Sequence, residues 1–268
     1  MKLNIISSTL SYISTDHWNS RLKMSNIDLE VVYSYPENKE DPLVVTDAAF
    51  YDLDPSYNNV YLWIIESPLI LEHFYIGYFE KVNRNKEKFK KIFTHDKYLI
   101  ESDNKFVFKS HGDCNIIDYQ NLDKNKLLSM ISSNKRWVGG HELRHQIIQK
   151  YHNKFDLYGR GFNDIDHKET GLNNYAFSVA VENCKKDYYF TEKIIDCFRT
   201  KTIPIYWGCP SIGDFFDKRG IIQFDNIDQL DYIINSLDYS KYYDVIDAVE
   251  NNYRLSFDYD TFFTNFKL

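Results

Sequence analysis

The pattern of apolar positions in the first half of the chain is typical of short strands. Apolar runs there are separated by polar turns that contain Pro, Asn and Asp. The predicted strands are Leu29–Tyr33, Leu43–Thr46, Val60–Glu66, Lys91–Thr94 and Lys105–Lys109. The segment Leu69–Phe89, between the third and fourth strands, is long enough for a helical crossover. This spacing favours a parallel sheet.

In the second half, apolar runs alternate more regularly with segments of helical periodicity. The predicted strands are Leu127–Ser132, Phe155–Tyr158, Ala176–Val181, Ile203–Trp207 and Ile221–Phe224, and the predicted helices are His141–Tyr151, Thr191–Arg199 and Ile227–Ser236. Such alternation predicts a doubly wound α/β fold. The polar segment Asp118–Lys126 is the candidate linker, so we expect an N-terminal domain over residues 1–122 and a C-terminal domain over residues 123–268.

Polar residues follow the predicted strands directly. Glu66-Ser67-Pro68 comes after one strand, Ser132-Ser133 after another, and Glu182-Asn183 after a third. Open α/β sheets bind ligands beyond the carboxyl ends of their strands. We therefore expect the functional residues at these strand ends.

Composition and charge restrict the class of protein. The chain has 268 residues, of which 43% are hydrophobic and 17% aromatic, a composition that excludes long disorder. Its formal net charge of −7 argues against a broad nucleic acid-binding surface. The longest apolar stretches, such as Val60–Ile65, are far shorter than the roughly 20 residues that span a bilayer. We expect neither a signal peptide nor a membrane anchor at the start of the chain, because Met1–Leu10 lacks a basic start followed by a long apolar run.

The four cysteines are too widely separated for a metal-binding knuckle. They are Cys114, Cys184, Cys197 and Cys209. We expect buried thiols in a cytoplasmic protein.

The densest group of chemically active side chains lies between a strand end and a helix start. Thr191 is a candidate N-cap of that helix, and the free N–H groups of the first turn form an anion site to which Lys193 adds a full positive charge. Glu192 can accept hydrogen bonds from a ribose diol, and Tyr189 can donate one from its phenol. The alternative is a capped helix with a solvated Glu–Lys pair.

Three ordered segments carry a family resemblance. They are Tyr175–Asn183 (YAFSVAVEN), Tyr189–Asp196 (YFTEKIID) and Thr202–Gly208 (TIPIYWG). Their order and spacing resemble the fucosyltransferase signature of glycosyltransferase family 10, although Val181 stands where an aromatic residue is usual. Ser133-Asn134 with Arg144, and Tyr158–Gly161, extend the resemblance over about residues 127–235, and it is thinner before residue 60.

The resemblance implies two facing Rossmann-like domains, the GT-B architecture. It also implies a GDP-fucose donor held by the C-terminal domain and an inverting transfer to a hydroxyl of a glycan acceptor, with no metal or other cofactor required. Arg144 matches the family arginine that contacts the diphosphate. The residues that match donor-contacting positions are Asn183, Tyr189, Glu192 and Lys193.

An inverting transfer needs a base that removes the proton of the acceptor hydroxyl, and a carboxylate suits this role. Glu66 directly follows the apolar run Val60–Ile65 and lies in a segment that resembles the family's E-S-P. The alternatives are a turn with an exposed glutamate, or a base among Glu101, Asp103 and Asp113, which lie near the fifth predicted strand.

Two other activities stay open from the sequence: transfer from a different GDP-sugar, and binding of a nucleotide sugar without turnover. His141 and His145 have the i, i+4 spacing of metal ligands, but the sequence shows no third ligand beside them. The basic run Glu80–Lys91 is typical of a solvated helix face, with an acceptor-binding or membrane-surface patch as the alternative.

Overall fold

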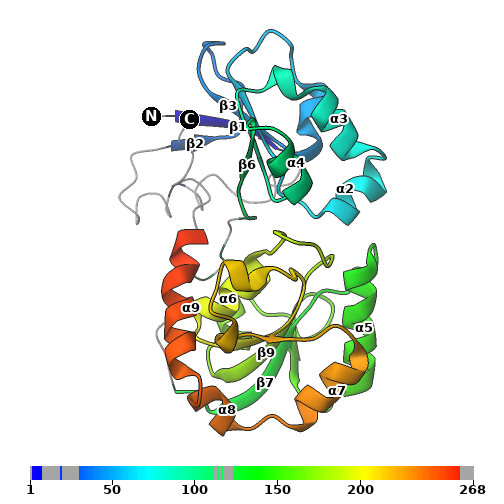
Figure 1. The fold of residues 1–268 in the computed structure, drawn as a ribbon, viewed down its shortest axis with the longest axis vertical. Helices are drawn as coiled ribbons and strands as arrows, with labels where there is room; N and C mark the ends of the chain where they lie inside the picture. The colour runs from blue at the N-terminus through cyan, green and yellow to red at the C-terminus, as the bar shows by residue number, and fades with distance from the viewer. Residues whose placement is uncertain are drawn as a thin grey trace. The chain divides into compact units, whose positions relative to one another are not determined.

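The computed structural model describes residues 2–7, 19, 30–111, 114, 116 and 123–259. The chain divides into two compact units, one built on the first 111 residues and the other on residues 112–261 (Figure 1). Over the residues that the structure describes, each unit contains a single sheet in which all paired strands are parallel. The α/β class expected from the sequence is confirmed.

The sheet of the first unit has the strand order β2-β1-β3-β4-β5-β6. Its strands are β1 (Lys2–Ser7), β2 (Glu30–Val32), β3 (Leu43–Thr46), β4 (Val60–Trp63), β5 (Ile92–Thr94) and β6 (Phe106–Phe108). The five predicted strands are all present, most of them shorter than predicted. Strand β1, which pairs with both β2 and β3, was not predicted.

Alternation along the strands gives this sheet two apolar faces. Val44 of β3 packs with one cluster of buried side chains, while Leu43 and Val45 pack with the other. The second cluster also contains Leu71 and Leu99 from the helices that follow β4 and β5. The helical segments of the unit are η1 (Asp47–Asp52), α2 (Pro68–Phe74), α3 (Tyr78–Arg84), η2 (Lys86–Lys88) and α4 (Lys97–Ser102).

The predicted single crossover over Leu69–Phe89 is two short helices, α2 and α3. The break falls at Gly77, whose φ of 71° is disfavoured for residues with a Cβ. The Glu72 carboxylate stabilises the turn by accepting the N–H groups of Gly77 (2.8 Å) and Phe79 (3.2 Å). The carboxylate thus replaces the helical hydrogen bonds that the turn interrupts.

The sheet of the second unit has the strand order β11-β10-β9-β7-β8. Its strands are β7 (Lys126–Ile131), β8 (Asp156–Tyr158), β9 (Tyr175–Val181), β10 (Ile203–Trp207) and β11 (Ile222–Gln223). The helical segments are α5 (Gly139–Tyr151), η3 (Lys168–Gly171), α6 (Glu192–Arg199), η4 (Ile212–Asp214), η5 (Lys218–Gly220), α7 (Ile227–Asn235), α8 (Tyr239–Tyr243) and α9 (Ile246–Tyr259). This is a doubly wound sheet whose strand order reverses between β7 and β9. The predicted elements are confirmed to within about two residues at their ends, and α8 and α9 were not predicted.

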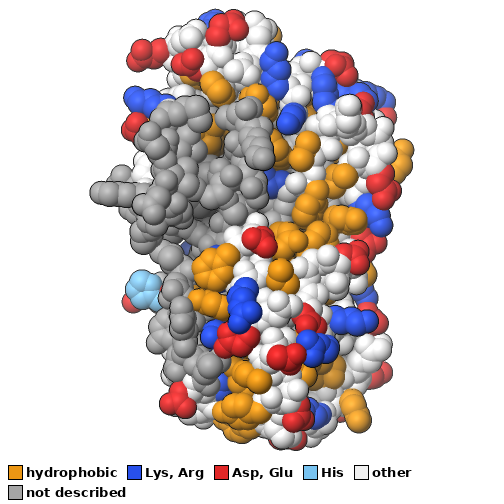
Figure 2. All heavy atoms as spheres, turned by 60° about the vertical axis from the view of Figure 1, so that its left-hand side comes forward, with side chains coloured by type: hydrophobic (Ala, Val, Ile, Leu, Met, Phe, Trp, Pro, Cys, Tyr) orange, Lys and Arg blue, Asp and Glu red, His pale blue; other side chains and the backbone are white. Residues whose placement is uncertain are grey.

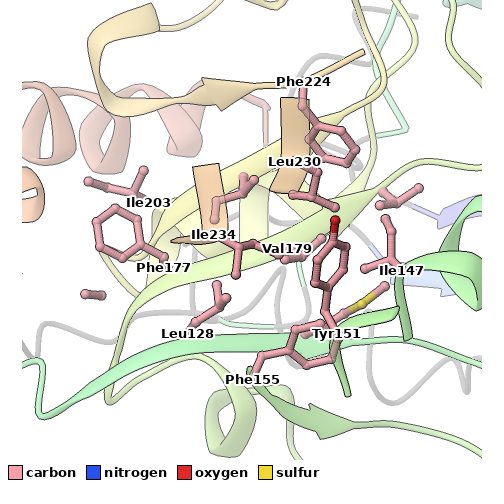
Figure 3. Packing of buried hydrophobic residues seen from close by; sticks show 14 of the residues in the cluster. Leu128, Ile147, Tyr151, Phe155, Phe177, Val179, Ile203, Phe224, Leu230 and Ile234 are labelled. Carbon is pink, nitrogen blue, oxygen red and sulfur yellow. The ribbon is translucent and has the colours of Figure 1, made fainter. Parts of the chain in front are cut away.

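The core of the second unit lies against the central strand β9, all seven residues of which are buried. Figure 3 shows Phe177 and Val179 of this strand packed in one cluster with Tyr151 of α5 and with Leu230 and Ile234 of α7. The Tyr151 hydroxyl also donates to α7, with its oxygen 3.0 Å from Asp231 Oδ1. This packing ties α5 and α7 to one sheet face, with Tyr151 holding the C-terminal end of α5.

Two expectations concern the chain as a whole. All four cysteines are buried free thiols. Among the described residues, no helix is both long and apolar enough to cross a bilayer. Of the predicted linker, residues 118–122 lie outside the described part, and Lys126 already belongs to β7.

Candidate active site

A pocket of about 280 Å³ lies at the carboxyl edge of the second sheet, beyond the neighbouring strands β7 and β9. The side chains that line it come from the ends of these strands, the segment after β8, helix α5 and the first turns of α6. They include Ser132, Ser133, Arg144, Gly159, Arg160, Lys168, Val181, Glu192, Lys193 and Asp196. This is the position at which doubly wound sheets bind ligands.

The N-terminus of α6 is anchored by Glu182, a fully buried residue that follows β9. Its Oε1 accepts the Thr191 N–H at 2.9 Å, and its Oε2 accepts the Thr191 hydroxyl at 2.7 Å. The Thr191 hydroxyl oxygen in turn accepts the N–H of Lys193, which confirms Thr191 as the N-cap. One buried carboxylate therefore determines where α6 begins.

Lys193 lies in the first turn of α6, where the helix dipole disfavours a positive charge. Its Nζ is 3.1 Å from Glu192 Oε1, 3.6 Å from Glu182 Oε2 and 3.0 Å from Thr191 Oγ1. The side chain is 24% exposed and lines the pocket. These two carboxylates offset the unfavourable dipole and hold the ammonium group at the pocket wall.

Arg144 connects α5 to the end of β9. Its Nε and Nη2 both donate to the Val181 carbonyl oxygen, at 2.9 and 2.6 Å, and Nη2 also donates to Asn183 Oδ1 at 2.8 Å. The guanidinium is buried and lines the pocket. The structure therefore brings Arg144, Glu192 and Lys193 together around one pocket, with Asn183 held by the same arginine.

Helix α5 can reach β9 because Gly140 has no side chain. A Cβ at this position would stand 2.0 Å from the Glu182 carbonyl oxygen and 2.6 Å from that of Asn183. The Gly140 N–H donates to the Asn183 carbonyl at 3.2 Å. This close approach places the first turn of α5 against the strand end that carries the site.

The surroundings of the pocket are electropositive. Burial, together with the positive charges of Arg144, Lys135 and Lys193, lowers the pKa of His141 from 6.5 to about 4. The neutral ring accepts the Trp137 N–H at its Nδ1, at 3.2 Å. A site that disfavours a protonated histidine favours an anion such as a diphosphate.

The carboxylates that face the pocket are paired. Lys168 Nζ lies 2.7 Å from Asp196 Oδ2 and 3.7 Å from Glu192 Oε1. Four cationic and two acidic side chains line the described wall: Arg144, Arg160, Lys168 and Lys193 against Glu192 and Asp196. In the described part of the chain, no group of three or more His, Cys, Asp or Glu side chains could hold a metal ion.

Tyr189 and Asn183 are not among the described residues that line the pocket. Tyr189 is 1% exposed, so its phenol lies inside the protein in this structure. Glu182 and Lys168 were absent from the expected site residues. Glu182 stood in the quoted motif, but Lys168 lies in the 3-10 segment η3, where no sequence pattern marked it.

Glu66 lies in the first unit, three residues after β4 ends, at the carboxyl edge of that sheet. Its Oε1 accepts the N–H of Ser67 at 2.7 Å, and Ser67 caps helix α2 through the Ile70 N–H. The Glu66 side chain is thus oriented by the same turn that begins the helix.

Two of the competing acids are described by the structure. Asp103 precedes β6 and therefore lies at the amino edge of the sheet, opposite to Glu66, where its hydrogen bond with Lys86 lowers the pKa of its carboxyl. Glu101 is an exposed residue of α4 that pairs with Lys97. Asp113 lies outside the described residues.

Comparison with known proteins identifies the family. Residues 121–258, just over half of the chain, match the model described as glycosyltransferase family 10 (fucosyltransferase), C-terminal part. The chain belongs to glycosyltransferase family 10. The family signature predicted from the sequence is confirmed.

Two curated relatives match shorter segments of the chain than the family model does. An 82-residue segment is 37% identical to the alpha-(1,3)-fucosyltransferase FucT of Helicobacter pylori, covering 31% of this chain and 16% of that protein. A 57-residue segment is 32% identical to an alpha-(1,4)-fucosyltransferase of Arabidopsis thaliana, covering 21% of this chain and 14% of the relative. The aligned segments therefore span less than a fifth of these curated relatives.

The crystal structure of an alpha1,3-fucosyltransferase with GDP-fucose aligns over 100% of this chain and 91% of its own, with a TM-score of 0.59 and 16% identity. At this level of identity the likeness shows the fold. The GT-B class expected for this protein is confirmed.

Proposed function

We propose that this protein binds GDP-fucose in the pocket of the second unit and transfers the fucosyl group, with inversion, to a hydroxyl of a glycan acceptor. In this proposal residues 123–268 form the donor domain and residues 1–122 the acceptor-side domain. The observation that carries it is a cationic pocket at the N-terminus of α6, built from the signature residues of a fucosyltransferase family.

The diphosphate of the donor suits the first turn of α6, where the positive end of the helix dipole and the Lys193 ammonium favour an anion. Arg144 supplies a second positive charge on the pocket wall. As the glycosidic bond breaks, negative charge grows on the leaving GDP, and these two groups stabilise it. Glu192 is assigned to the ribose diol, and Asn183 and Tyr189 complete the donor set by their place in the family motif.

Glu66 is proposed as the general base. Its carboxylate would accept the proton of the acceptor hydroxyl while that oxygen attacks the anomeric carbon from the face opposite GDP. Its place three residues beyond β4, at the edge where such sheets bind ligands, supports this role.

Binding measurements test the donor assignment. We expect GDP-fucose to bind in the presence of EDTA, because cationic side chains take the place of a metal at the diphosphate. At 100 times its Kd the donor should stabilise the protein by about 2.7 kcal/mol. Stabilisation by UDP-glucose without stabilisation by GDP-fucose would reject the proposal, and GDP-mannose tests whether another GDP-sugar is the donor.

A matched pair of lysine variants locates the diphosphate. Lys193→Ala should weaken GDP binding by roughly 10- to 100-fold, the worth of one charge-assisted hydrogen bond. Lys185→Ala is the control, because Lys185 pairs with Asp225 and does not line the pocket. Equal GDP affinity in both variants, measured by calorimetry, would place the diphosphate elsewhere.

The acceptor and the compartment are part of the same proposal. On the face that Figure 2 shows, acidic and basic side chains are interspersed, which does not favour a nucleic acid as the acceptor. We propose a cytoplasmic location, supported by the four buried free thiols.

A further inference from the structure

The backbone around Glu66 is held by Asp47, a residue outside every motif considered above. Asp47 directly follows β3, the strand beside β4, and is 1% exposed. Its Oδ1 accepts two backbone N–H groups, that of Ile65 at 2.8 Å and that of Glu66 at 3.1 Å. One carboxylate oxygen thus binds the peptide groups on both sides of Ile65.

The strand on the other side of β4 contributes a second contact. His95 directly follows β5 and is fully buried, and its Nε2 lies 3.1 Å from the carbonyl oxygen of Glu66, to which it donates. Both backbone polar groups of Glu66 are therefore bound by residues that follow the two neighbouring strands. With Oε1 bound by Ser67 N, the carboxylate is oriented as well.

Asp47 adopts this position at a conformational cost. Its φ is 44°, in the left-handed region, which Asp and Asn tolerate better than most residues with a Cβ. A glycine would adopt this backbone more easily but would have no oxygen to offer to the two N–H groups. Strain of this kind persists where the surrounding structure requires it, and functional sites are where it concentrates.

We propose that Asp47 is a positioning residue for the transfer reaction, fixing the Glu66 peptide so that the carboxylate meets the acceptor oxygen in a single orientation. This inference rests on the proposed role of Glu66 as the base. A misplacement of about 1 Å at a reacting group can lower the rate roughly 100-fold, so a rigid backbone at Glu66 should keep the rate of transfer high.

Two substitutions separate the oxygen of Asp47 from its backbone conformation. Asp47→Asn keeps both the side-chain oxygen that accepts the two N–H groups and a tolerance of positive φ, whereas Asp47→Gly keeps only the backbone conformation. The measurement is release of GDP from GDP-fucose, with water and with N-acetyllactosamine as acceptors. We expect Asp47→Asn to retain most of kcat, and Asp47→Gly to lose about 100-fold in kcat with unchanged GDP affinity and acceptor KM.

Denaturant unfolding of each variant shows whether it is folded. If Asp47→Gly does not fold, Asp47→Ser takes its place. The shorter serine side chain cannot reach both N–H groups, so its kcat should also fall. Wild-type kcat in folded Asp47→Gly or Asp47→Ser would overturn the inference.

A double variant distinguishes positioning from an independent effect. Because Asp47 acts through Glu66, adding Asp47→Gly to Glu66→Gln should cause no further loss of rate. A full additional loss would overturn the positioning role while leaving the base in place. Unchanged turnover in Glu66→Gln alone would instead reject Glu66 as the base, and this inference with it.

Discussion

At the scale of single residues, Glu182 shapes the pocket of the second unit without lining it. It is fully buried, it accepts two hydrogen bonds from Thr191, and its Oε2 lies 3.6 Å from the Lys193 ammonium. A buried carboxylate is tolerated only when its oxygens are bound in this way. The start of α6, and with it Lys193, depends on this one side chain.

Glu182→Gln should therefore lower the free energy of unfolding by roughly 1–3 kcal/mol, because the amide cannot accept from both Thr191 groups. Glu192→Gln is the matched control. Glu192 lies on the pocket wall with its side chain 18% exposed, so Glu192→Gln should weaken donor binding and lower stability less than the change at the fully buried Glu182 does. Urea denaturation and GDP calorimetry on the two variants measure this difference. Equal stability of both would contradict the anchoring role.

His141 predicts a pH dependence of stability. Its pKa is about 4 in the folded protein against 6.5 ordinarily, so between these values the unfolded chain binds a proton that the folded chain does not. The free energy of unfolding should therefore fall as pH decreases from about 6.5 to about 4.

His141→Asn should reduce this pH dependence, because the Asn oxygen can replace Nδ1 as acceptor of the Trp137 N–H without taking up a proton. Urea unfolding of both proteins at several pH values between 4 and 7 compares the slopes. Identical slopes would show that His141 does not titrate in this range.

At the scale of elements, the contact between α5 and β9 depends on one glycine of an adjacent pair. Gly140 lies against backbone atoms of Glu182 and Asn183, whereas a Cβ at Gly139 would meet no atom within 4 Å. The two glycines are neighbours in one helix turn but differ completely in their surroundings.

Gly140→Ala should move α5 away from β9, because the new Cβ would stand 2.0 Å from the Glu182 carbonyl oxygen, and the backbone there cannot give way as a flexible side chain could. We expect a loss of stability of about 1–3 kcal/mol from overpacking and weaker GDP binding, since Arg144 moves with the helix. Gly139→Ala should instead stabilise the protein by up to about 1 kcal/mol through helix propensity. Thermal unfolding and GDP calorimetry test both variants, and equal behaviour would contradict the proposed close approach.

At the scale of the whole molecule, the proposed chemistry is divided between the two units. Glu66 lies in the first, and Arg144, Glu192 and Lys193 lie in the second. Donor binding and proton removal should therefore be separable by mutation.

Glu66→Gln should slow transfer by roughly 10²- to 10⁴-fold, the usual worth of a positioned proton acceptor, with GDP affinity unchanged. Rates of GDP release from GDP-fucose and the Kd of GDP, measured on the same preparation, test this. A fall in GDP affinity that matches the fall in rate would show that Glu66 acts on donor binding instead.

The sequence by itself determined the fold class, most strands and the family. Period-two alternation and buried apolar runs reflect which side chains must leave water, and this constraint is local enough to predict β3, β9 and β10 closely. The signature around Thr191 and Lys193 specified the helix start because capping involves residues next to one another in the chain.

The tertiary structure decided what depends on distant segments. Asp47 and Glu66 are brought together because β3 and β4 are neighbours in the sheet, and Lys168 meets Asp196 because η3, which packs against β7 and β8, lies within reach of α6. Helix propensity also could not predict the break at Gly77, which the Glu72 carboxylate stabilises. Hydrogen bonds and charge pairs between elements form only after the sheet brings the strand ends together. A local pattern of residues therefore cannot predict them.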